Sequence, residues 1–257
     1  MNCLIGYTGF VGSNIASKRQ FDVLVNSKNS KDIIGQSFDE IVCAGVPAVK
    51  WKANAHPDED IACINSLIDV LKTTTAKKFT LISTIDVYAP KTGVDEKYDC
   101  HRDENDPYGK HRLMFEDFCK SHFNDVLVVR LPGLFGYGLK KNVIFDLMND
   151  NCLDAINPKS SFQYYFLDHL ADDIDLFRDK ISTGVVNVFT EPIVTEEIAS
   201  KFFAGKDIGQ NAGKEVHYDA HTIFASINGK TGCYMYSKDE VMRDLEEYLS
   251  KSVKCNE

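Results

Sequence analysis

Two side chains that can take part in proton exchange stand at well-marked places in this sequence. Thr84 directly follows residues 78–83, an apolar segment that indicates a strand, and Tyr108 comes 24 residues later, where a helix over about residues 110–121 is predicted to open. A phenol has an unperturbed pKa of about 10, so it needs a nearby positive charge to exchange protons near pH 7. The pair is therefore a candidate for acid–base chemistry at the end of a strand.

Residues 6–12 form a glycine-rich loop of the pattern GxxGxxG between a short strand-like segment, residues 2–5, and a predicted helix. Gly6 permits a tight turn, Gly9 lets the backbone approach a pyrophosphate, and Gly12 lets the helix pack against the strand. The first N–H groups of the helix then face the bound anion. The loop predicts dinucleotide binding; the alternative is a tight strand-to-helix turn without a ligand. The other predicted cofactor-binding residues of this loop are Thr8, Phe10 and Val11.

The residues at the end of the second predicted strand, 22–26, indicate which dinucleotide binds. A carboxylate at this place would bind the ribose 2′-hydroxyl of NAD and repel the 2′-phosphate of NADP. The sequence has Asn26, Ser27 and Lys28 there instead, and these groups can receive a phosphate. We therefore predict that these three residues bind the cofactor and that NADP is preferred over NAD. The alternative for Lys28 is an ordinary solvated loop lysine.

Strand-like and helix-like segments alternate through the first half of the chain. From Asp60, apolar residues recur with a spacing of three or four, which marks one buried face of a helix. Strands separated by helices imply a parallel sheet covered on both faces. Few residues separate the second strand from the third, which leaves little room for a helix there. The predicted strands are residues 2–5, 22–26, 39–44, 78–83 and 125–131.

The second half of the chain is less regular. Thr195 begins one predicted helix, the capping box of residues 237–240 begins another, and residues 206–236 between them indicate a loop with short strands. We divide the chain once, into residues 1–138 as the dinucleotide-binding domain and residues 139–257 as a smaller substrate-binding lobe that is interleaved with the sheet.

The composition excludes several classes of protein. The chain has 38 acidic and 29 basic residues and a net charge of −9, whereas a protein that follows nucleic-acid phosphates is usually basic. No apolar run approaches the roughly 20 residues that span a bilayer, and the N-terminus does not resemble a signal peptide. The eight cysteines include no CxxC pair, so we expect reduced thiols in a cytoplasmic protein and no metal site. Neither a nucleic acid nor a membrane is an expected partner.

The glycine loop, the strand that ends at Thr84 and residues 107–112 together resemble the extended short-chain dehydrogenase/reductase family. Its members are NAD(P)-dependent nucleotide-sugar epimerases, dehydratases and reductases. The resemblance covers roughly residues 1–200 and implies an α/β, Rossmann-type doubly wound parallel sheet with a small C-terminal substrate-binding lobe. Further matches to the family are Ala44, Gly45, Asn65, Asn187 and residues 130–136 and 165–172.

The family's chemistry implies a role for each residue of the pair. Tyr108 would exchange a proton with a substrate hydroxyl or ketone while hydride moves to or from the nicotinamide, and Thr84 would hydrogen-bond the substrate oxygen. The family has a lysine one helical turn after this tyrosine. Arg112 takes its place, where it would lower the Tyr108 pKa and anchor the nicotinamide ribose, whereas Lys110 points to another helix face. The cofactor contacts that the resemblance adds are Ala44, Gly45, Ser83, Tyr108, Arg112 and Pro132.

The two positions after Thr84 bear on the type of reaction. The family's dehydratases have an Asp-Glu pair there, and this chain has Ile85 and Asp86. Ile85 has no proton to donate for the elimination of water, so a 4,6-dehydratase is disfavoured. Asp86 is a candidate substrate-binding residue. An NADP preference favours a keto-sugar reductase over an epimerase, because an epimerase regenerates its own cofactor.

The substrate and the partners follow from the same resemblance. Lys140 and Asn142 lie where the family contacts a diphosphate, which favours a nucleotide-linked sugar, whereas residues 160–163 lack the arginine that often holds the nucleotide. A homodimer is expected through the helix after the third strand and the helix that carries Tyr108. The alternative function is a cofactor-binding member of the family with little or no catalysis, acting as a sensor or scaffold.

Overall fold

The computed structural model describes residues 1–254 of the chain. These residues form two compact units, of which the first consists of residues 1–90, 96–131 and 168–187, and the second of the remainder. The single division predicted at residue 138 differs from this arrangement, because residues 168–187 return to the first unit. A substrate-binding role for the second unit stays a prediction.

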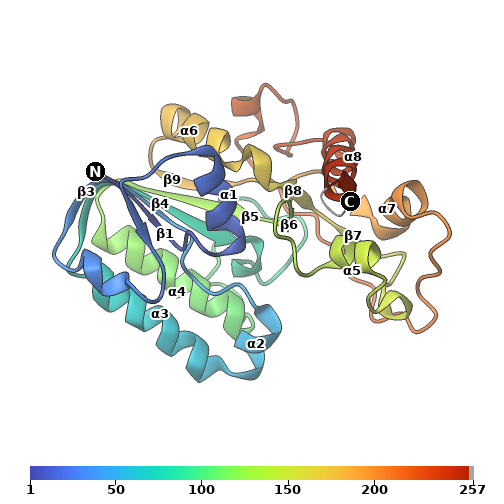
Figure 1. The fold of residues 1–257 in the computed structure, drawn as a ribbon, viewed down its shortest axis with the longest axis horizontal. Coiled ribbons are helices and arrows are strands. Elements are labelled where there is room, and N and C mark those ends of the chain that lie inside the picture. Colours follow the sequence, from blue (N-terminus) through green and yellow to red (C-terminus); the bar gives the residue numbers. More distant parts are fainter. Residues whose placement is uncertain (255–257) are drawn as a thin grey trace. The chain divides into compact units, whose positions relative to one another are not determined.

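A six-stranded parallel sheet forms the centre of the first unit (Figure 1). Its strands, in spatial order, are β2 (Val23–Val25), β1 (Asn2–Ile5), β3 (Ser37–Cys43), β4 (Thr75–Thr84), β5 (Val126–Leu131) and β9 (Gly184–Asn187). The chain runs outward from β1 to β2 and then crosses back to β3 on the other side of β1. Ligands of open α/β sheets bind outside the carboxyl ends of the strands at such a reversal. The parallel pairing and this strand order confirm the predicted Rossmann-type parallel sheet.

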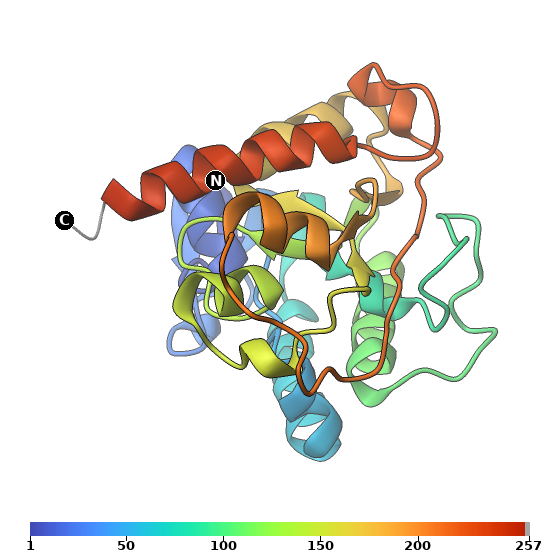
Figure 2. The same cartoon turned by 90° about the vertical axis from the view of Figure 1, so that its right-hand side faces the viewer.

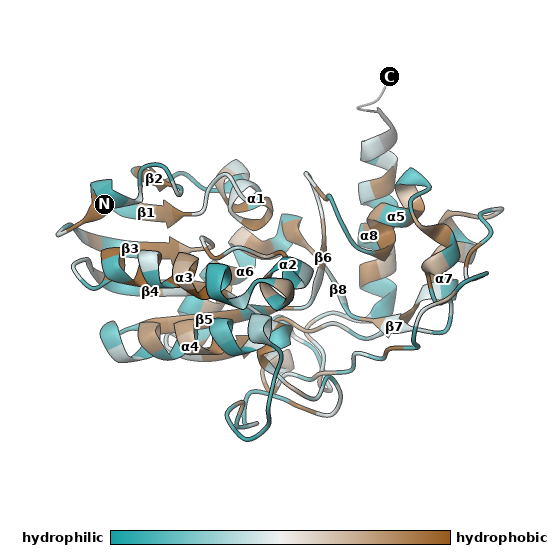
Figure 3. Cartoon of the chain, turned by 90° about the horizontal axis from the view of Figure 1, so that it is seen from below, coloured by the Kyte–Doolittle hydropathy of each residue, from teal (hydrophilic) through white to brown (hydrophobic). Residues whose placement is uncertain are grey.

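Helices cover both faces of this sheet. On one face, α1 (Phe10–Lys18) contacts α6 (Leu170–Lys180), and on the other α2 (Lys50–Ala55) and α3 (Pro57–Leu71) contact α4 (Pro107–His122) (Figure 1). Hydrophobic and hydrophilic residues alternate around α3 and α4 (Figure 3). Their buried sides, with Ile64, Ile68 and Leu71 on α3 and Phe115 and Cys119 on α4, join the core against the strands. The apolar spacing seen from Asp60 onward is therefore confirmed as a core-facing stripe.

The predicted boundaries of these elements shift by a few residues. Strand β4 begins at Thr75 and α4 at Pro107, each three residues earlier than the sequence indicates. Helix α4 begins early because the Asp106 carboxylate accepts a hydrogen bond from Gly109 N at 2.9 Å, with Pro107 at the first helical position. Only a short 3-10 turn, η1 (Ser30–Ile33), separates β2 from β3, as the short connection predicts.

The second unit contains two small sheets and three α-helices. Strands β6 (Gly133–Phe135) and β8 (Tyr164–Phe166) pair in parallel, and β7 (Ser161–Phe162) and β10 (Ile193–Val194) pair antiparallel. The helices are α5 (Val143–Asn149), α7 (Thr195–Phe202) and α8 (Lys238–Lys254), the long red helix of Figure 2. Helix α8 packs on β8.

Two sequence predictions for the second unit have different outcomes. The capping box before α8 is confirmed, because Glu240 accepts a hydrogen bond from Ser237 N at 2.9 Å and the Ser237 hydroxyl accepts one from Glu240 N. The prediction of short strands within residues 206–236 is wrong, because this stretch forms only isolated β-bridges and one 3-10 turn, η5 (Ala225–Asn228).

The described residues also bear on the cysteines and on membranes. Seven cysteines are free thiols, and Cys255 lies outside the described residues. No helix within residues 1–254 is both long enough and apolar enough to cross a membrane.

Candidate active site

The glycine loop lies where the carboxyl ends of β1, β2 and β3 meet. Gly6 N donates to Val25 O at 2.7 Å, and Ala44 N donates to Ile5 O at 2.8 Å. Gly6 has a φ of +88°, and a Cβ there would lie 2.4 Å from Ala44 O. A side chain at residue 6 would therefore clash with the end of β3 as well as strain the backbone. The structure thus brings together Gly6, Ala44 and Gly45, which the sequence assigns to the cofactor.

The start of α1 is open toward the same edge of the sheet. A Cβ on Gly12 would lie 2.1 Å from Gly6 O, so the helix packs directly on the turn. Gly9 precedes the helix, and no side chain of the described residues caps its first turn. The N–H groups of this turn, which includes Phe10 and Val11, therefore remain suited to an anion. Thr8 is exposed beside them.

The turn after β2 is built partly by the residues predicted to hold the 2′-phosphate. The Asn26 side chain accepts a hydrogen bond from Lys28 N at 2.8 Å and donates to the Tyr7 hydroxyl at 3.3 Å. Ser27 and Lys28 have exposed side chains at the carboxyl end of β2. The structure therefore gives Asn26 a turn-forming role that the sequence did not indicate, and leaves Ser27 and Lys28 accessible.

Thr84 and Tyr108 lie together, as the sequence predicts. Thr84 ends β4 and caps the short turn η2 (Ile85–Val87), because its Oγ1 accepts a hydrogen bond from Asp86 N at 3.1 Å. The Thr84 hydroxyl lies near enough to the Tyr108 hydroxyl to lower the Tyr108 pKa. Tyr108 N donates to the Asn54 side chain of α2 at 2.9 Å, and the tyrosine is only 7% exposed. The pair is therefore held by two neighbouring elements.

Gly109 makes this close approach of α4 to η2 possible. A Cβ at this position would lie 2.1 Å from Asp86 O and 2.4 Å from the Asn105 side-chain nitrogen. Asn105 in turn donates to Asp86 O at 2.7 Å and to Val87 O at 3.1 Å. Gly109 is not among the site residues predicted from the sequence, although its place directly after the tyrosine is a signal that the helix start is crowded.

Arg112 is buried beneath Tyr108 and is tightly held. Its guanidinium lies over the Tyr108 ring, 3.9 Å from the ring centroid. It donates hydrogen bonds to both carboxylate oxygens of Asp60, one of them at 2.8 Å, and a further hydrogen bond to Pro47 O. His111 lies 2.8 Å from the same carboxylate. Burial opposes the ionised form of Asp60, but hydrogen bonds from Arg112 and His111 hold its pKa below the usual value. The positive charge of Arg112 is therefore already paired within the protein.

The acidity of Tyr108 is set by burial and by four neighbouring groups. Burial raises its pKa to about 12, while Arg112, Lys50 and the Thr84 hydroxyl act in the opposite direction and Asp86 adds to the rise. Arg112 thus acts on the Tyr108 pKa in the predicted direction, although burial outweighs it in the protein alone.

Lys50 belongs to this site, although it is not among the residues predicted from the sequence. It begins α2, and its Nζ lies 2.7 Å from the Asp86 carboxylate and 3.4 Å from that of Asp106. The candidate substrate-binding residue Asp86 is therefore ion-paired. In the sequence, only the position of Lys50 shortly after the third strand could have indicated this residue. That position does not reveal which carboxylates the lysine contacts.

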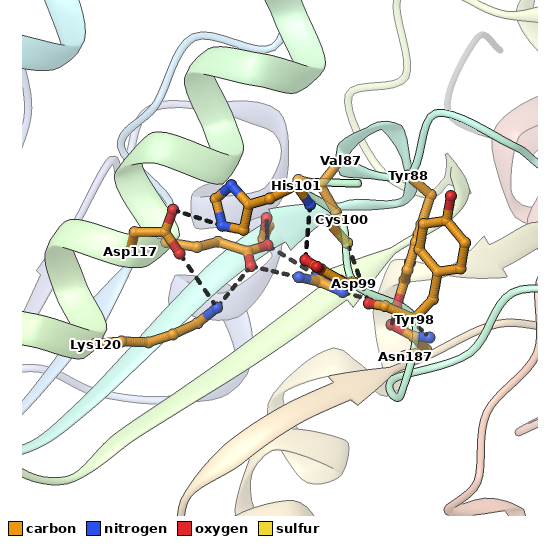
Figure 4. A network of polar contacts seen from close by, with 12 residues as sticks. Val87, Tyr88, Tyr98, Asp99, Cys100, His101, Asp117, Lys120 and Asn187 are labelled. Carbon is orange, nitrogen blue, oxygen red and sulfur yellow. Dashed lines mark hydrogen bonds and ion pairs between the residues drawn. The ribbon is translucent and has the colours of Figure 1, made fainter. Parts of the chain in front are cut away.

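Ser83 points its hydroxyl into a buried polar network. It donates to Glu116 at 2.6 Å, and Arg130 donates to both oxygens of the same carboxylate, at 3.0 and 2.6 Å. Arg130 also donates to the Tyr88 hydroxyl, which is hydrogen-bonded to Asn187 (Figure 4). The network links β4, α4, β5 and β9 and rigidifies the strand that carries Thr84. The Ser83 hydroxyl therefore already has a partner. The cofactor contact predicted for Ser83 would have to be made by its other atoms.

The remaining predicted residues, Pro132, Lys140 and Asn142, belong to the second unit. Asn142 caps α5, because its side chain accepts a hydrogen bond from Phe145 N at 3.1 Å and donates to Leu134 O at 2.8 Å. Pro132 is buried and Lys140 is exposed. The structure therefore assigns Asn142 a structural role, and ligand contacts of all three stay predictions.

The sequence also matches a known family. The profile of the NAD dependent epimerase/dehydratase family matches residues 19–155, more than half of the chain. A comparison with curated protein sequences finds no match. With the parallel sheet and the Thr84–Tyr108 pair, this match shows that the chain belongs to the NAD-dependent epimerase/dehydratase family.

Solved structures share the fold at low sequence identity. The dTDP-4-dehydrorhamnose reductase of Bacillus anthracis in complex with NADP superposes with a TM-score of 0.74 at 14% identity, over 97% of this chain and 98% of that one. The UDP-glucose 4-epimerase of Thermotoga maritima with UDP-glucose gives 0.73 at 14% identity, over 98% and 100%. A double mutant of the dTDP-glucose 4,6-dehydratase of Streptomyces venezuelae gives 0.73 at 13%, over 96% of each chain. These similarities show the fold.

Proposed function

We propose that this protein is an NADP-dependent reductase that acts on the keto group of a sugar, and that this sugar is linked to a nucleotide. The observation that carries the proposal is the close approach of Thr84 and Tyr108 at the carboxyl end of β4, in a chain of the NAD-dependent epimerase/dehydratase family. Two similar structures are a reductase that binds NADP and an epimerase that binds UDP-glucose, which supports this substrate class. A homodimer in the cytoplasm is part of the same proposal.

The residues of the first unit fit a nicotinamide dinucleotide. The turn at Gly6 and the uncapped start of α1 suit a pyrophosphate, because a side chain at either Gly6 or Gly12 would clash with backbone atoms there. Ser27 and Lys28 are exposed where a 2′-phosphate would lie, and no carboxylate stands among residues 26–28 to repel it. When bound, the nicotinamide supplies the hydride.

The raised pKa of Tyr108 suits the proton-donor role that reduction of a ketone requires. A phenol with a pKa of about 12 is protonated at neutral pH, so Tyr108 acts as the acid that gives its proton to the substrate oxygen as a hydroxyl forms. Thr84 then orients that oxygen through a hydrogen bond. The reverse reaction would need the phenolate, which burial of Tyr108 disfavours.

The test combines cofactor binding with turnover. Fluorescence titrations with NADPH and NADH should show tighter binding of NADPH, and a panel of nucleotide-linked keto sugars should include one that consumes NADPH. Tyr108→Phe should lower that turnover by about 100-fold or more while NADPH still binds. Tighter binding of NADH would favour an epimerase, and binding of neither cofactor would overturn the proposal.

A second candidate function is a cofactor-binding sensor or scaffold with little catalysis. It is favoured by the pairing of Arg112 with Asp60, since this cation replaces the family's lysine and is not free to act on substrate. Tight NADPH binding without turnover of any keto sugar would support this candidate over the reductase.

A further inference from the structure

A tyrosine of the glycine loop contacts the turn that follows β2. Strands β1 and β2 run in parallel with Ile5 opposite Val25, so the residues that follow these two strands lie side by side at one edge of the sheet. Beyond that edge, the Tyr7 hydroxyl accepts a hydrogen bond from Asn26 Nδ2 at 3.3 Å. Tyr7 therefore reaches from the loop that suits a pyrophosphate to the turn where a 2′-phosphate is expected.

The backbone of the glycine loop fixes the place of Tyr7. Gly9 N donates to Gly6 O at 2.9 Å, so Tyr7 and Thr8 are the two central residues of a closed turn. Gly6 N is itself bound to Val25 O at 2.7 Å. Tyr7 is partly buried, whereas Thr8 is exposed. The hydrogen bonds that shape the loop thus also hold Tyr7 beside the end of β2.

We propose that Tyr7 determines cofactor specificity by donating a hydrogen bond to the 2′-phosphate of NADP. The inference deepens the proposed function and rests on the NADP preference that is part of it. Tyr7 is not among the cofactor-binding residues predicted from the sequence, although it stands between two of them, Gly6 and Thr8.

The orientation of the Asn26 amide leaves the Tyr7 proton free. Asn26 Oδ1 accepts a hydrogen bond from Lys28 N at 2.8 Å, and a backbone N–H can only donate, so the amide nitrogen of Asn26 is the atom that faces Tyr7. That nitrogen donates, and the phenol oxygen accepts. A tyrosine hydroxyl also carries one proton of its own, and no acceptor for it lies among residues 1–254.

A phosphate supplies the acceptor that this proton lacks. A phosphate monoester presents three strong acceptor oxygens and carries a charge of about −1.5 to −2 near pH 7. Lys28 and Ser27 are exposed in the same turn and can bind further oxygens of one phosphate. Tyr7, Ser27 and Lys28 therefore offer donors to a single anion at the end of β2.

The charge of the acceptor decides which cofactor gains more from Tyr7. A hydrogen bond to an ionised acceptor is roughly twice as strong as one between neutral groups. The 2′-phosphate of NADP is ionised, whereas the 2′-hydroxyl of NAD is neutral. The phenol of Tyr7 consequently favours NADP without repelling NAD.

The test compares ligands that differ only at the 2′ position of the ribose. Calorimetric titrations of the full chain use 2′,5′-ADP, which carries the 2′-phosphate, and 5′-AMP, which has a hydroxyl there. Tyr7→Phe keeps the ring and removes the hydroxyl, so the affinity for 2′,5′-ADP should fall about tenfold and that for 5′-AMP by less than about threefold. NADPH and NADH should show the same contrast.

The control is a second tyrosine that loses its hydroxyl. Tyr248 belongs to α8 in the second unit, where its ring packs against Phe135 and Phe166. Tyr248→Phe should leave the affinities for all four ligands unchanged. Losses of equal size in Tyr248→Phe and Tyr7→Phe overturn the inference.

The outcomes separate this inference from the proposed function. If NADPH binding depends on the Tyr7 hydroxyl but no keto sugar is reduced, the inference holds while the reductase proposal fails. If Tyr7→Phe leaves NADPH affinity unchanged, or weakens NADPH and NADH equally, the hydroxyl does not bind the 2′-phosphate, and the inference fails while the reductase proposal stands. Tighter binding of NADH than of NADPH by the natural chain, or binding of neither, overturns the inference together with the NADP assignment.

Discussion

The guanidinium of Arg112 lies 3.9 Å over the ring of Tyr108 while it holds Asp60 of the neighbouring helix. A planar guanidinium can stack on a ring with one face and bind a carboxylate through its edge at the same time. The ammonium group of a lysine cannot do both. Arg112 therefore supports the underside of the tyrosine and joins α3 to α4.

Arg112→Lys should consequently destabilise the protein. The ammonium keeps the charge but loses the stacking and part of the hydrogen bonding to Asp60 and Pro47 O, so the free energy of unfolding should fall by about 1–3 kcal/mol in urea titrations. Lys110→Arg, an exposed change in the same helical turn, is the matched control and should have almost no effect. Higher stability or higher turnover in Arg112→Lys would show that the arginine weakens the site.

Gly109→Ala should be destabilising although alanine favours helices. The substitution would normally stabilise a helix by about 1 kcal/mol. Here its Cβ would lie 2.1 Å from Asp86 O, so α4 must move away from η2 and Tyr108 must move away from Thr84. We expect a loss of about 1–3 kcal/mol in the free energy of unfolding together with lower turnover.

The control for this change is a glycine with open surroundings. A Cβ on Gly213 would have its nearest neighbour at 3.9 Å, so Gly213→Ala should change the free energy of unfolding by no more than about 0.5 kcal/mol. Equal effects of the two substitutions would mean that crowding at Gly109 is not what fixes the helix start.

The sequence predicts those parts of the fold that depend on local spacing. The buried stripe of α3, the glycine loop after β1 and the Thr84–Tyr108 pair each follow from residue types at short, fixed intervals. Partners far apart along the chain are not predictable in this way. Arg112 meets Asp60 across 52 residues and Lys50 meets Asp86 across 36, and neither spacing carries a pattern.

The direction in which a side chain points is not predictable from the sequence either. Ser83 and Thr84 are neighbours in β4, so their side chains point to opposite faces of the sheet. Thr84 reaches Tyr108, whereas Ser83 reaches the buried carboxylate of Glu116. Both hydroxyls are near the predicted cofactor in sequence, but only the structure shows that the Ser83 hydroxyl already has a charged partner.

Lys28→Glu should reverse the cofactor preference. The exposed lysine follows β2, and a carboxylate there would repel a 2′-phosphate and be neutral or favourable toward a 2′-hydroxyl. We expect NADPH affinity to fall about tenfold or more, with little change for NADH, in fluorescence titrations. Lys31→Glu, the same charge change at an exposed position in η1, should affect NADPH much less. Equal losses in both variants would point to net charge rather than to a phosphate contact.

The capping box of α8 should make stability sensitive to acid. Burial opposes ionisation of Glu240, but hydrogen bonds from Lys230 and Ser237 lower its pKa to about 2. A glutamate in the unfolded chain titrates at about 4.3. Because the folded pKa is the lower one, this contribution to stability is fully present above about pH 5 and is lost as the pH falls toward about 2.

Glu240→Gln separates this charge from the cap itself, since glutamine can also serve in a capping box. The variant should be less stable than the natural chain at pH 7, and the difference between them should shrink as the pH falls from about 5 to about 2. Ser237→Ala removes a hydroxyl that does not titrate. Its loss of about 1 kcal/mol in the free energy of unfolding should therefore change less with pH than the loss caused by Glu240→Gln. Free energies of unfolding from urea titrations at a series of pH values measure both. A difference for Glu240→Gln that stays constant down to pH 2 would show that the Lys230–Glu240 pair contributes nothing through its charge.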